Sequence, residues 1–421
     1  MIVVLAFFGL LLLGLPIAFV IISAAVVGVR AFTDTSMIIV IQQMFGGLDN
    51  FVQLAIPFFV IAGNMAANGK TSEHLIKVMS VVFGRLKGGS VIATIAACAF
   101  FAAISGSGLA TIVAIGTLMI PGLIREGYPD KMAVGTVCCA GSLGILIPPS
   151  APMILICVAM GTSVGRQFTA GFIPGIFLAI CWSIYVFIVS RKRNYGGEIS
   201  YSAPEAAQIF LKAVPALLFP IIVLGSIYTG WATPTEAAAI SVVYVLFLEL
   251  FIYRTARLTE IPNMFYQGLI SASTLVLIIS AAQVLNWLMT VQQVPVMIST
   301  MLATAVSSKT AFILLMWLVF LVCGCFVDLV ALIVVLAPIL VPSLAIYGID
   351  PIHFGIMAVM ATQIGCITPP FGVNLFVTMN VAGKNFTEVV GSTFPYLIIL
   401  VIVSMVVSFI PEIAMFLPNR M

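Results

Sequence analysis

The chain has 421 residues, of which 62% are hydrophobic and 7% are charged, and its formal net charge is +3. Because soluble domains carry about 25% charged residues, no soluble core could bury this much apolar surface, and lipid must be the surrounding solvent. The positive charge is small and dispersed, which excludes a basic nucleic-acid-binding patch and predicts no nucleic-acid partner.

The first predicted element is a membrane span over Val3–Val27. Its apolar stretch is too long for the hydrophobic part of a secretory signal, and no basic segment precedes it, so we interpret it as a retained span. Arg30 follows at the expected outer end, where its side chain can reach the lipid headgroups or, alternatively, an anion. Other runs long enough for a helix to cross a bilayer are Phe51–Ala67, Met132–Gly161, Phe172–Ser190, Val214–Ile227, Thr235–Tyr253, Met264–Thr290, Phe354–Val381 and Phe394–Ile410.

Two longer apolar blocks, Val91–Ile124 and Ala311–Leu344, differ from these spans. Basic residues collect in cytoplasmic loops, so Arg191-Lys192-Arg193 marks a cytoplasmic loop. Counting spans from there puts the basic residues on both sides of the first block inside the cell, which a single crossing would not allow. Each block is interrupted, at Ser105–Gly108 and at Gly324–Asp328. We therefore predict two re-entrant hairpins, the first opening to the cytoplasm and the second to the outer face.

Two spans contain double prolines, Pro148-Pro149 and Pro369-Pro370. Proline lacks a backbone donor and clashes with the preceding turn, so both spans are predicted to be discontinuous helices. Unpaired carbonyl groups inside a membrane need a partner, and a hard cation such as Na⁺ suits them. A kink filled by water and a simple packing bend are the alternatives.

The two halves of the chain repeat each other. One ungapped offset of 221 residues aligns the two double prolines, and it places Gly144 opposite Gly365 and Ser107 opposite Asp328. The number of spans between the copies predicts that they have opposite orientations. Inverted repeats with broken helices near the membrane midplane are typical of secondary transporters.

Two hairpin positions are candidate binding residues. Asp328 is an acidic residue deep in an apolar block, where an ionisable group is costly and normally contacts a ligand or a coupling ion; capping a half-helix is the alternative. The Ser105–Gly108 tip offers hydroxyl groups and a helix N-terminus suited to anions, although small residues also allow close helix packing. Thr233 to Glu236 instead reads as a capping box with a structural role.

No nucleophile–base pair, metal-binding cluster or P-loop is present, so the sequence does not predict an enzyme. Three alternatives to partner-dependent secondary transport are a dicarboxylate or ion carrier that needs no binding protein, an ion channel with paired hairpins, and a lipid-processing membrane enzyme.

The sequence resembles the large membrane subunit of the tripartite ATP-independent periplasmic (TRAP) transporters over nearly its whole length. The resemblance is carried by IPFFVIAGNMAANG, SGSGLAT, GSLGILIPPSAP, GWATPTEAAA and IGCITPPFGVN. It implies an all-α, multi-pass protein of the bacterial inner membrane that works as an elevator, importing a small organic acid together with Na⁺. It also implies two partners, a separate small four-helix membrane subunit and a periplasmic substrate-binding protein, and no organic cofactor.

The resemblance further implies two Na⁺ sites and one substrate site. The first Na⁺ site would involve Ser105, Gly144, Ile147 and Ser150. The second would involve Gly324, Gly365, Thr368 and the backbone of Phe371. Substrate would contact Ser107, Ser150 and Asp328 between the hairpin tips.

The predicted organisation alternates scaffold and transport segments. The scaffold comprises residues 1–87, 171–263 and 264–308 and the C-terminal helix of 384–421, and the two transport repeats are 88–170 and 309–383. Substrates implied by the resemblance are organic acids such as sialic acids and C4-dicarboxylates. A carboxylate at Asp328 repels a plain anion but can accept hydrogen bonds from hydroxyl or amide groups, or hold a bridging cation. The sialic acid N-acetylneuraminate is therefore favoured, with C4-dicarboxylates next.

Overall fold

The computed structural model describes residues 2–196 and 199–421, and the secondary structure of this part of the chain is helical. Eight of its helices are long and apolar enough to cross a membrane. The α-helices are α1 (Ile2–Leu12), α2 (Ile17–Phe32), α3 (Ile38–Leu48), α4 (Ala55–Asn68), α5 (Thr71–Phe83), α6 (Gly89–Ser105), α7 (Gly108–Arg125), α8 (Asp130–Gly141), α9 (Ala151–Met160), α10 (Val164–Arg193), α11 (Ala203–Tyr228), α12 (Pro234–Phe247), α13 (Ile261–Val291), α14 (Val294–Ala305), α15 (Lys309–Gly324), α16 (Leu329–Ile346), α17 (Pro351–Cys366), α18 (Val373–Ala382), α19 (Phe386–Phe409) and α20 (Pro411–Met415). Short 3₁₀ segments precede α4 (η1, Phe51–Leu54) and follow α8 (η2, Ser142–Ile145), and a π-helical turn follows α12 (η3, Leu248–Ile252).

The predicted breaks in the helices are confirmed. α6 ends at Ser105 and α7 begins at Gly108, while α15 ends at Gly324 and α16 begins at Leu329. The first double proline lies between η2 and α9, and the second lies between α17 and α18; both Pro-Pro peptide bonds are cis. That α6–α7 and α15–α16 enter and leave the membrane on one side stays a prediction.

The 221-residue offset is visible in the helix boundaries. It carries α7 onto α16 at both ends and the first residue of α8 onto the first residue of α17. Gln363 Nε2 donates to Ser142 Oγ at 2.5 Å, and these two residues are themselves 221 positions apart. Equivalent residues that touch each other lie close to the axis relating the two halves.

The two broken helices run antiparallel. Lys384, just after α18, forms an ion pair with Asp130, the first residue of α8. At the other end, Gln167 in the first turn of α10, three residues after α10 begins, donates to Ile352 O at the start of α17 at 3.3 Å. Each broken helix therefore begins at the end of the molecule where the other one finishes.

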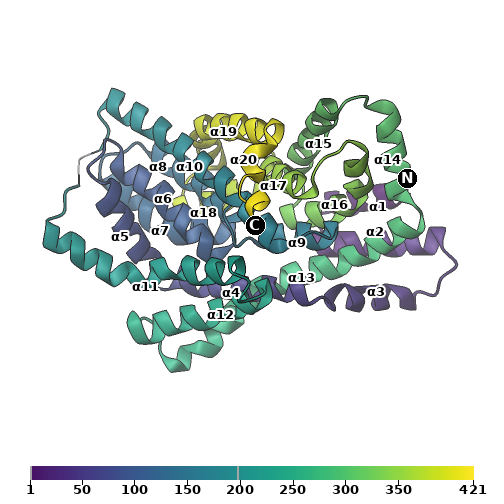
Figure 1. The fold of residues 1–421 in the computed structure, drawn as a ribbon, viewed down its shortest axis with the longest axis horizontal. Coiled ribbons are helices and arrows are strands. Elements are labelled where there is room, and N and C mark those ends of the chain that lie inside the picture. Colours follow the sequence, from purple (N-terminus) through teal and green to yellow (C-terminus); the bar gives the residue numbers. More distant parts are fainter. Residues whose placement is uncertain (1, 197–198) are drawn as a thin grey trace.

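Long helices around this centre form a supporting frame. α4 packs against α12 and α13, and α13 also packs against α2 and α3; these helices run along the lower edge in Figure 1. Thr235 Oγ1 at the start of α12 donates to Phe51 O at 2.8 Å, next to the start of α4. The predicted capping box is confirmed, with Thr233 at the N-cap of α12 and Glu236 at N3.

The prediction of one span over Val3–Val27 is wrong. Gly14 has a φ of +77° and is followed by Pro16, so the helix stops and restarts, giving the packed pair α1 and α2. The span prediction also did not include α3, α5 and α14, because helices of 11 to 13 residues are too short to cross a bilayer. α10, α11 and α13 are longer than predicted, since their polar ends continue the helix past the apolar run.

Candidate substrate and ion site at the helix breaks

The tip between α6 and α7 is held by hydroxyl groups. Ser105 is buried, and its Oγ lies 3.0 Å from Thr111 Oγ1. The Ser107 carbonyl accepts from both hydroxyls, at 3.3 Å from Ser105 Oγ and 2.8 Å from Thr111 Oγ1. Ser107 is also the N-cap of α7, where its Oγ accepts from Ala110 N at 3.4 Å. The two predicted serines thus lie together at the start of α7.

We call the segments between the two parts of each broken helix the Pro-Pro links; they are residues 142–150 and 367–372. The first link packs directly on the α6–α7 tip. A Cβ on Gly144 would lie 2.4 Å from the carbonyl oxygen of Ser107, so glycine is needed for the approach. Ala151 N, at the start of α9, donates to Gly106 O at 3.4 Å. Backbone oxygens of the tip and of the link therefore lie within a few ångströms of each other.

Two further residues predicted for the first Na⁺ site belong to this link. Ser150 is fully buried, and its Oγ donates to Ile145 O at 2.7 Å. Ile147 is 4% exposed, and its N–H donates to Leu143 O at 2.8 Å. The fold therefore gathers the first predicted set around the α6–α7 tip; its role in binding Na⁺ stays a prediction.

The second predicted set is also brought together, with different contacts. A Cβ on Gly365 would lie 2.5 Å from the carbonyl carbon of Gly324. Thr368 Oγ1 donates to Ile364 O at 2.7 Å, in the last turn of α17. Phe371 is 56% exposed, and its ring lies against that of Phe326, with the ring centroids 6.2 Å apart. In this half the last turn of α17 touches the end of α15, whereas in the first half η2 touches the start of α7.

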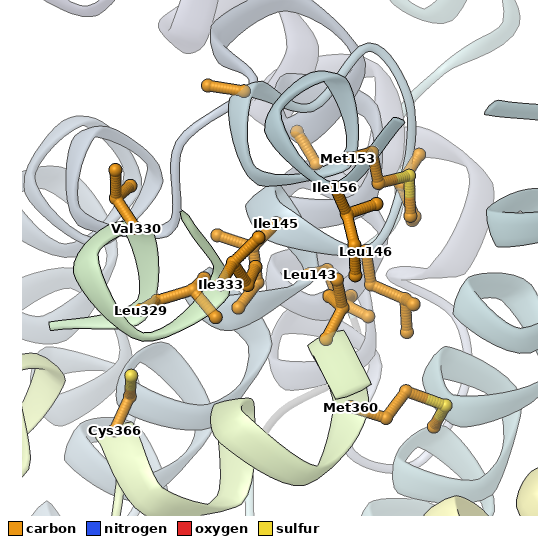
Figure 2. Close-up of a cluster of buried hydrophobic side chains, with 14 of the residues drawn as sticks. Leu143, Ile145, Leu146, Met153, Ile156, Leu329, Val330, Ile333, Met360 and Cys366 are labelled. Atoms are coloured by element: carbon orange, nitrogen blue, oxygen red, sulfur yellow. The ribbon is translucent and has the colours of Figure 1, made fainter. Parts of the chain in front are cut away.

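Asp328 is the N-cap of α16, and its Oδ1 accepts from Val330 N at 2.9 Å. It is thus the structural counterpart of Ser107, and the capping alternative describes its geometry. α16 packs against α9. In Figure 2, Leu329 and Ile333 of α16 extend toward Ile145 of η2, so the first turns of α16 face the segment that precedes the first double proline.

The ligands that this centre can offer are oxygen atoms. Each half supplies backbone carbonyls at an unwound link and hydroxyl groups beside them. Such hard oxygen donors suit an alkali or alkaline-earth cation rather than a thiophilic metal. One carboxylate, on Asp328, adds a formal charge at the second tip.

Sequence reasoning missed four contributors. Thr111 follows Ser107 by one helical turn, a spacing that could have suggested it. Ser142 and Gln363 could have been found from the 221-residue offset. Gly63 of α4 approaches the hairpin tip, and a Cβ there would lie 2.7 Å from Ser105 Cα; no local signal in the sequence predicts that contact.

Comparison with known proteins assigns the sequence to a family. The family model described as "Tripartite ATP-independent periplasmic transporter, DctM component" matches residues 4–413. The chain belongs to the DctM family of TRAP transporters. It is therefore the large permease subunit of a secondary transporter for small organic solutes, a multi-pass bacterial membrane protein and not an enzyme.

Relatives of this DctM-family permease differ in the solute they are named for. The chain is 39% identical to the C4-dicarboxylate TRAP transporter large permease protein DctM of Pseudomonas aeruginosa, covering 90% of this chain and 88% of the relative. It is 33% identical to the sialic acid TRAP transporter large permease protein SiaM of Vibrio cholerae, covering 98% and 96%. It is 35% identical to the isethionate TRAP transporter permease protein DctMQ of Oleidesulfovibrio alaskensis, covering 96% of this chain and 64% of the relative.

The fold is also that of a solved transporter. The Alcanivorax borkumensis YdaH transporter superposes with a TM-score of 0.63 at 16% identity, covering 89% of this chain and 87% of the other. The permease therefore shares its helical architecture with a transporter whose sequence is far diverged.

Proposed function

We propose that this permease imports a small organic acid together with Na⁺, by moving the two helix pairs and the two broken helices against the α4–α12–α13 frame. The observation that supports it is that each broken helix meets a helix pair at its break: η2 contacts the start of α7, and the last turn of α17 contacts the end of α15. In this proposal α6–α7 and α15–α16 are re-entrant hairpins, and the motion is an elevator.

The charges at the two tips differ, and the difference suggests how an organic acid is oriented. α7 begins at a neutral cap, Ser107, so the partial positive charge of that helix end is available to a carboxylate. α16 begins at Asp328, whose carboxylate already offsets its helix end. The substrate carboxylate would lie at α7, and hydroxyl or amide groups would donate to Asp328.

In this mechanism Na⁺ orders the links. Ser105, Gly144, Ile147 and Ser150 would hold one ion, and Gly324, Gly365, Thr368 and the Phe371 backbone would hold a second. Because Gly144 touches the Ser107 carbonyl, an ion bound at the first link stiffens the α7 tip that receives substrate. Na⁺ and substrate then raise each other's affinity by the same factor.

Two substrate classes follow from different observations. The orientation above favours a polyhydroxylated acid such as sialic acid, because Asp328 needs donors. The relatives named for C4-dicarboxylates favour a dicarboxylate, which would need a cation to bridge to Asp328. The partners proposed are a small four-helix subunit and a periplasmic binding protein; the name DctMQ of the longer isethionate relative agrees with such a subunit.

The decisive experiment is uptake into liposomes that contain the permease with its small subunit and binding protein. We expect accumulation of labelled sialic acid or succinate when Na⁺ is outside, and loss of uptake when K⁺ or choline replaces Na⁺. Uptake that is indifferent to this exchange contradicts Na⁺ coupling. Full uptake without the binding protein supports the partner-independent carrier, and a substrate-free conductance supports the channel.

A further inference from the structure

The surface of the molecule carries a groove that the transport site does not use. It has a volume of 400 Å³ and lies between α6 and α10. Its floor is made of small side chains, Ala96 and Ala99 on α6 and Ala179 and Ser183 on α10. Large apolar side chains form its rims, among them Ile180, which is 51% exposed.

The length of the groove matches one leaflet of a bilayer. On α6 it runs from Ile92 to Phe100 and on α10 from Ile176 to Phe187, which at 1.5 Å per residue are lengths of about 12 and 16 Å. Half of the hydrocarbon core of a membrane is about 15 Å thick. A single acyl chain entering from one membrane surface would therefore fill the groove.

One end of the groove is surrounded by basic residues. Phe83 and Leu86 line that end and flank Arg85, with Lys87 next along the chain. On the other side, α10 continues from Phe187 into the exposed residues Arg191-Lys192-Arg193.

Contacts between the two sides hold the basic residues together. A Cβ on Gly88 would lie 2.7 Å from Ser190 Oγ, so the loop that carries Arg85 and Lys87 packs on the last turn of α10. Gly84 O accepts from Ile199 N at 3.0 Å, which fastens the same loop to the segment after α10. Glu126, two residues before Tyr128, adds an acidic residue near this end, where Tyr128 packs against Gly196.

We propose that this groove binds one anionic phospholipid, with an acyl chain between α6 and α10 and the phosphate at the basic end. Basic clusters between membrane helices select anionic headgroups. The volume is in the range of small-molecule sites, roughly 300–1,000 Å³. The site is independent of the proposed Na⁺ and substrate contacts.

The test is native mass spectrometry of the purified permease, with its small subunit, from nanodiscs of equal phosphatidylglycerol and phosphatidylcholine. We expect one retained phosphatidylglycerol per permease. Substituting Arg191→Gln, Lys192→Gln and Arg193→Gln should lower its retention at least tenfold, since each basic residue near the surface contributes about 1 kcal/mol. The matched control, Arg254→Gln with Arg257→Gln after η3, removes basic residues that do not border the groove and should retain the lipid.

One groove-filling double variant keeps all the basic residues, and so keeps the membrane orientation that those residues help to set. Ala96→Phe with Ala179→Leu should abolish the retained lipid, whereas Val243→Phe on the exposed face of α12 should not. Equal retention of both lipids, equal loss in the Arg254/Arg257 control, or unchanged retention in the filled variant overturns the proposal. So does a cross-link from Ala96→Cys to a helix of the small subunit, because that places a protein in the groove.

Discussion

Ser107 and Asp328 occupy the same position at the start of two matching helices, and each caps its helix with its own side chain. A capping role and a binding role are compatible. A cap uses one side-chain oxygen, and the residue still lies at a helix break where backbone groups are free to contact a ligand. The two roles can be separated by choosing substitutions that keep the cap.

The first prediction concerns the charge of Asp328. Asparagine is as good an N-cap as aspartate, so Asp328→Asn should leave the melting temperature almost unchanged while abolishing uptake. Asp328→Ala should lose uptake and also about 1 kcal/mol of stability. Thermal unfolding in detergent and liposome uptake would measure both effects. An Asn variant with full uptake removes Asp328 from the binding site.

The second prediction concerns the close approach of Gly144. Gly144→Ala places a Cβ 2.4 Å from the Ser107 carbonyl oxygen, so the tip and the link must separate, at a cost of about 1–3 kcal/mol. We expect at least a tenfold loss of Na⁺-dependent uptake. Gly122→Ala on α7 is the control, because a Cβ there meets no atom within 4 Å. Equal uptake by both variants would show that the contact is not needed.

At the scale of elements, the bend between α4 and α5 is held by a buried acidic residue. Glu249 in η3 is fully buried and accepts from Lys70 N at 3.1 Å, Thr71 N at 3.2 Å and Thr71 Oγ1 at 2.6 Å. Thr255 Oγ1 donates to it as well. These bonds satisfy backbone donors at the start of α5, which a helix otherwise leaves unpaired.

The corresponding bend between α13 and α14 is held far more loosely. There Gln292 Nε2 donates to Phe32 O at 3.0 Å in an exposed setting. The α4–α5 bend is therefore fastened by more buried side-chain hydrogen bonds than the α13–α14 bend.

The third prediction follows from this difference. Glu249→Gln turns one acceptor into a donor that faces other donors, so it should destabilise the protein by about 1–3 kcal/mol. Hydrogen exchange should rise at residues 69–73. Gln292→Ala should cost less than about 1 kcal/mol, because its bond is solvent-exposed. If the Glu249→Gln protein has the melting temperature and the hydrogen-exchange rates of the unmodified protein, the hydrogen bonds of Glu249 do not stabilise the α4–α5 bend.

At the scale of the whole molecule, side-chain contacts show which helix ends lie at the same end of the molecule. Asp130 meets Lys384 at one end of the broken helices, and Gln167 meets Ile352 at the other. The basic residues after α10 belong with the first group by the positive-inside rule. α13 begins after Arg254 and Arg257, which the same rule places inside, so we expect the loop holding Gln292 at its other end on the opposite side of the membrane.

The fourth prediction tests this arrangement. In intact cells, a membrane-impermeant maleimide should label Gln292→Cys, whereas Lys192→Cys should react only after the inner membrane is opened. The unmodified chain is the control, since seven of its eight cysteines lie in helices and six of the eight are buried. Labelling of both variants from the same side would refute the inverted arrangement.

The sequence by itself determined the features that depend on local chemistry. Apolar length predicted most spans, prolines and glycines predicted the breaks, and the 221-residue offset predicted that Ser107 and Asp328 are counterparts. These follow because backbone geometry at proline and glycine, and the transfer of apolar side chains into lipid, are decided within a few residues.

Only the tertiary structure decided which of these breaks touch each other. The approach of Gly144 to Ser107, of Gly63 to Ser105 and the clamp of Glu249 on the α4–α5 bend join residues up to 179 positions apart. Such contacts depend on how the helices pack and cross, and the sequence around each residue carries no record of its distant partner. The first span was mispredicted for a related reason: hydropathy measures the affinity of a segment for lipid and not its direction, so it did not reveal the turn at Gly14 and Pro16.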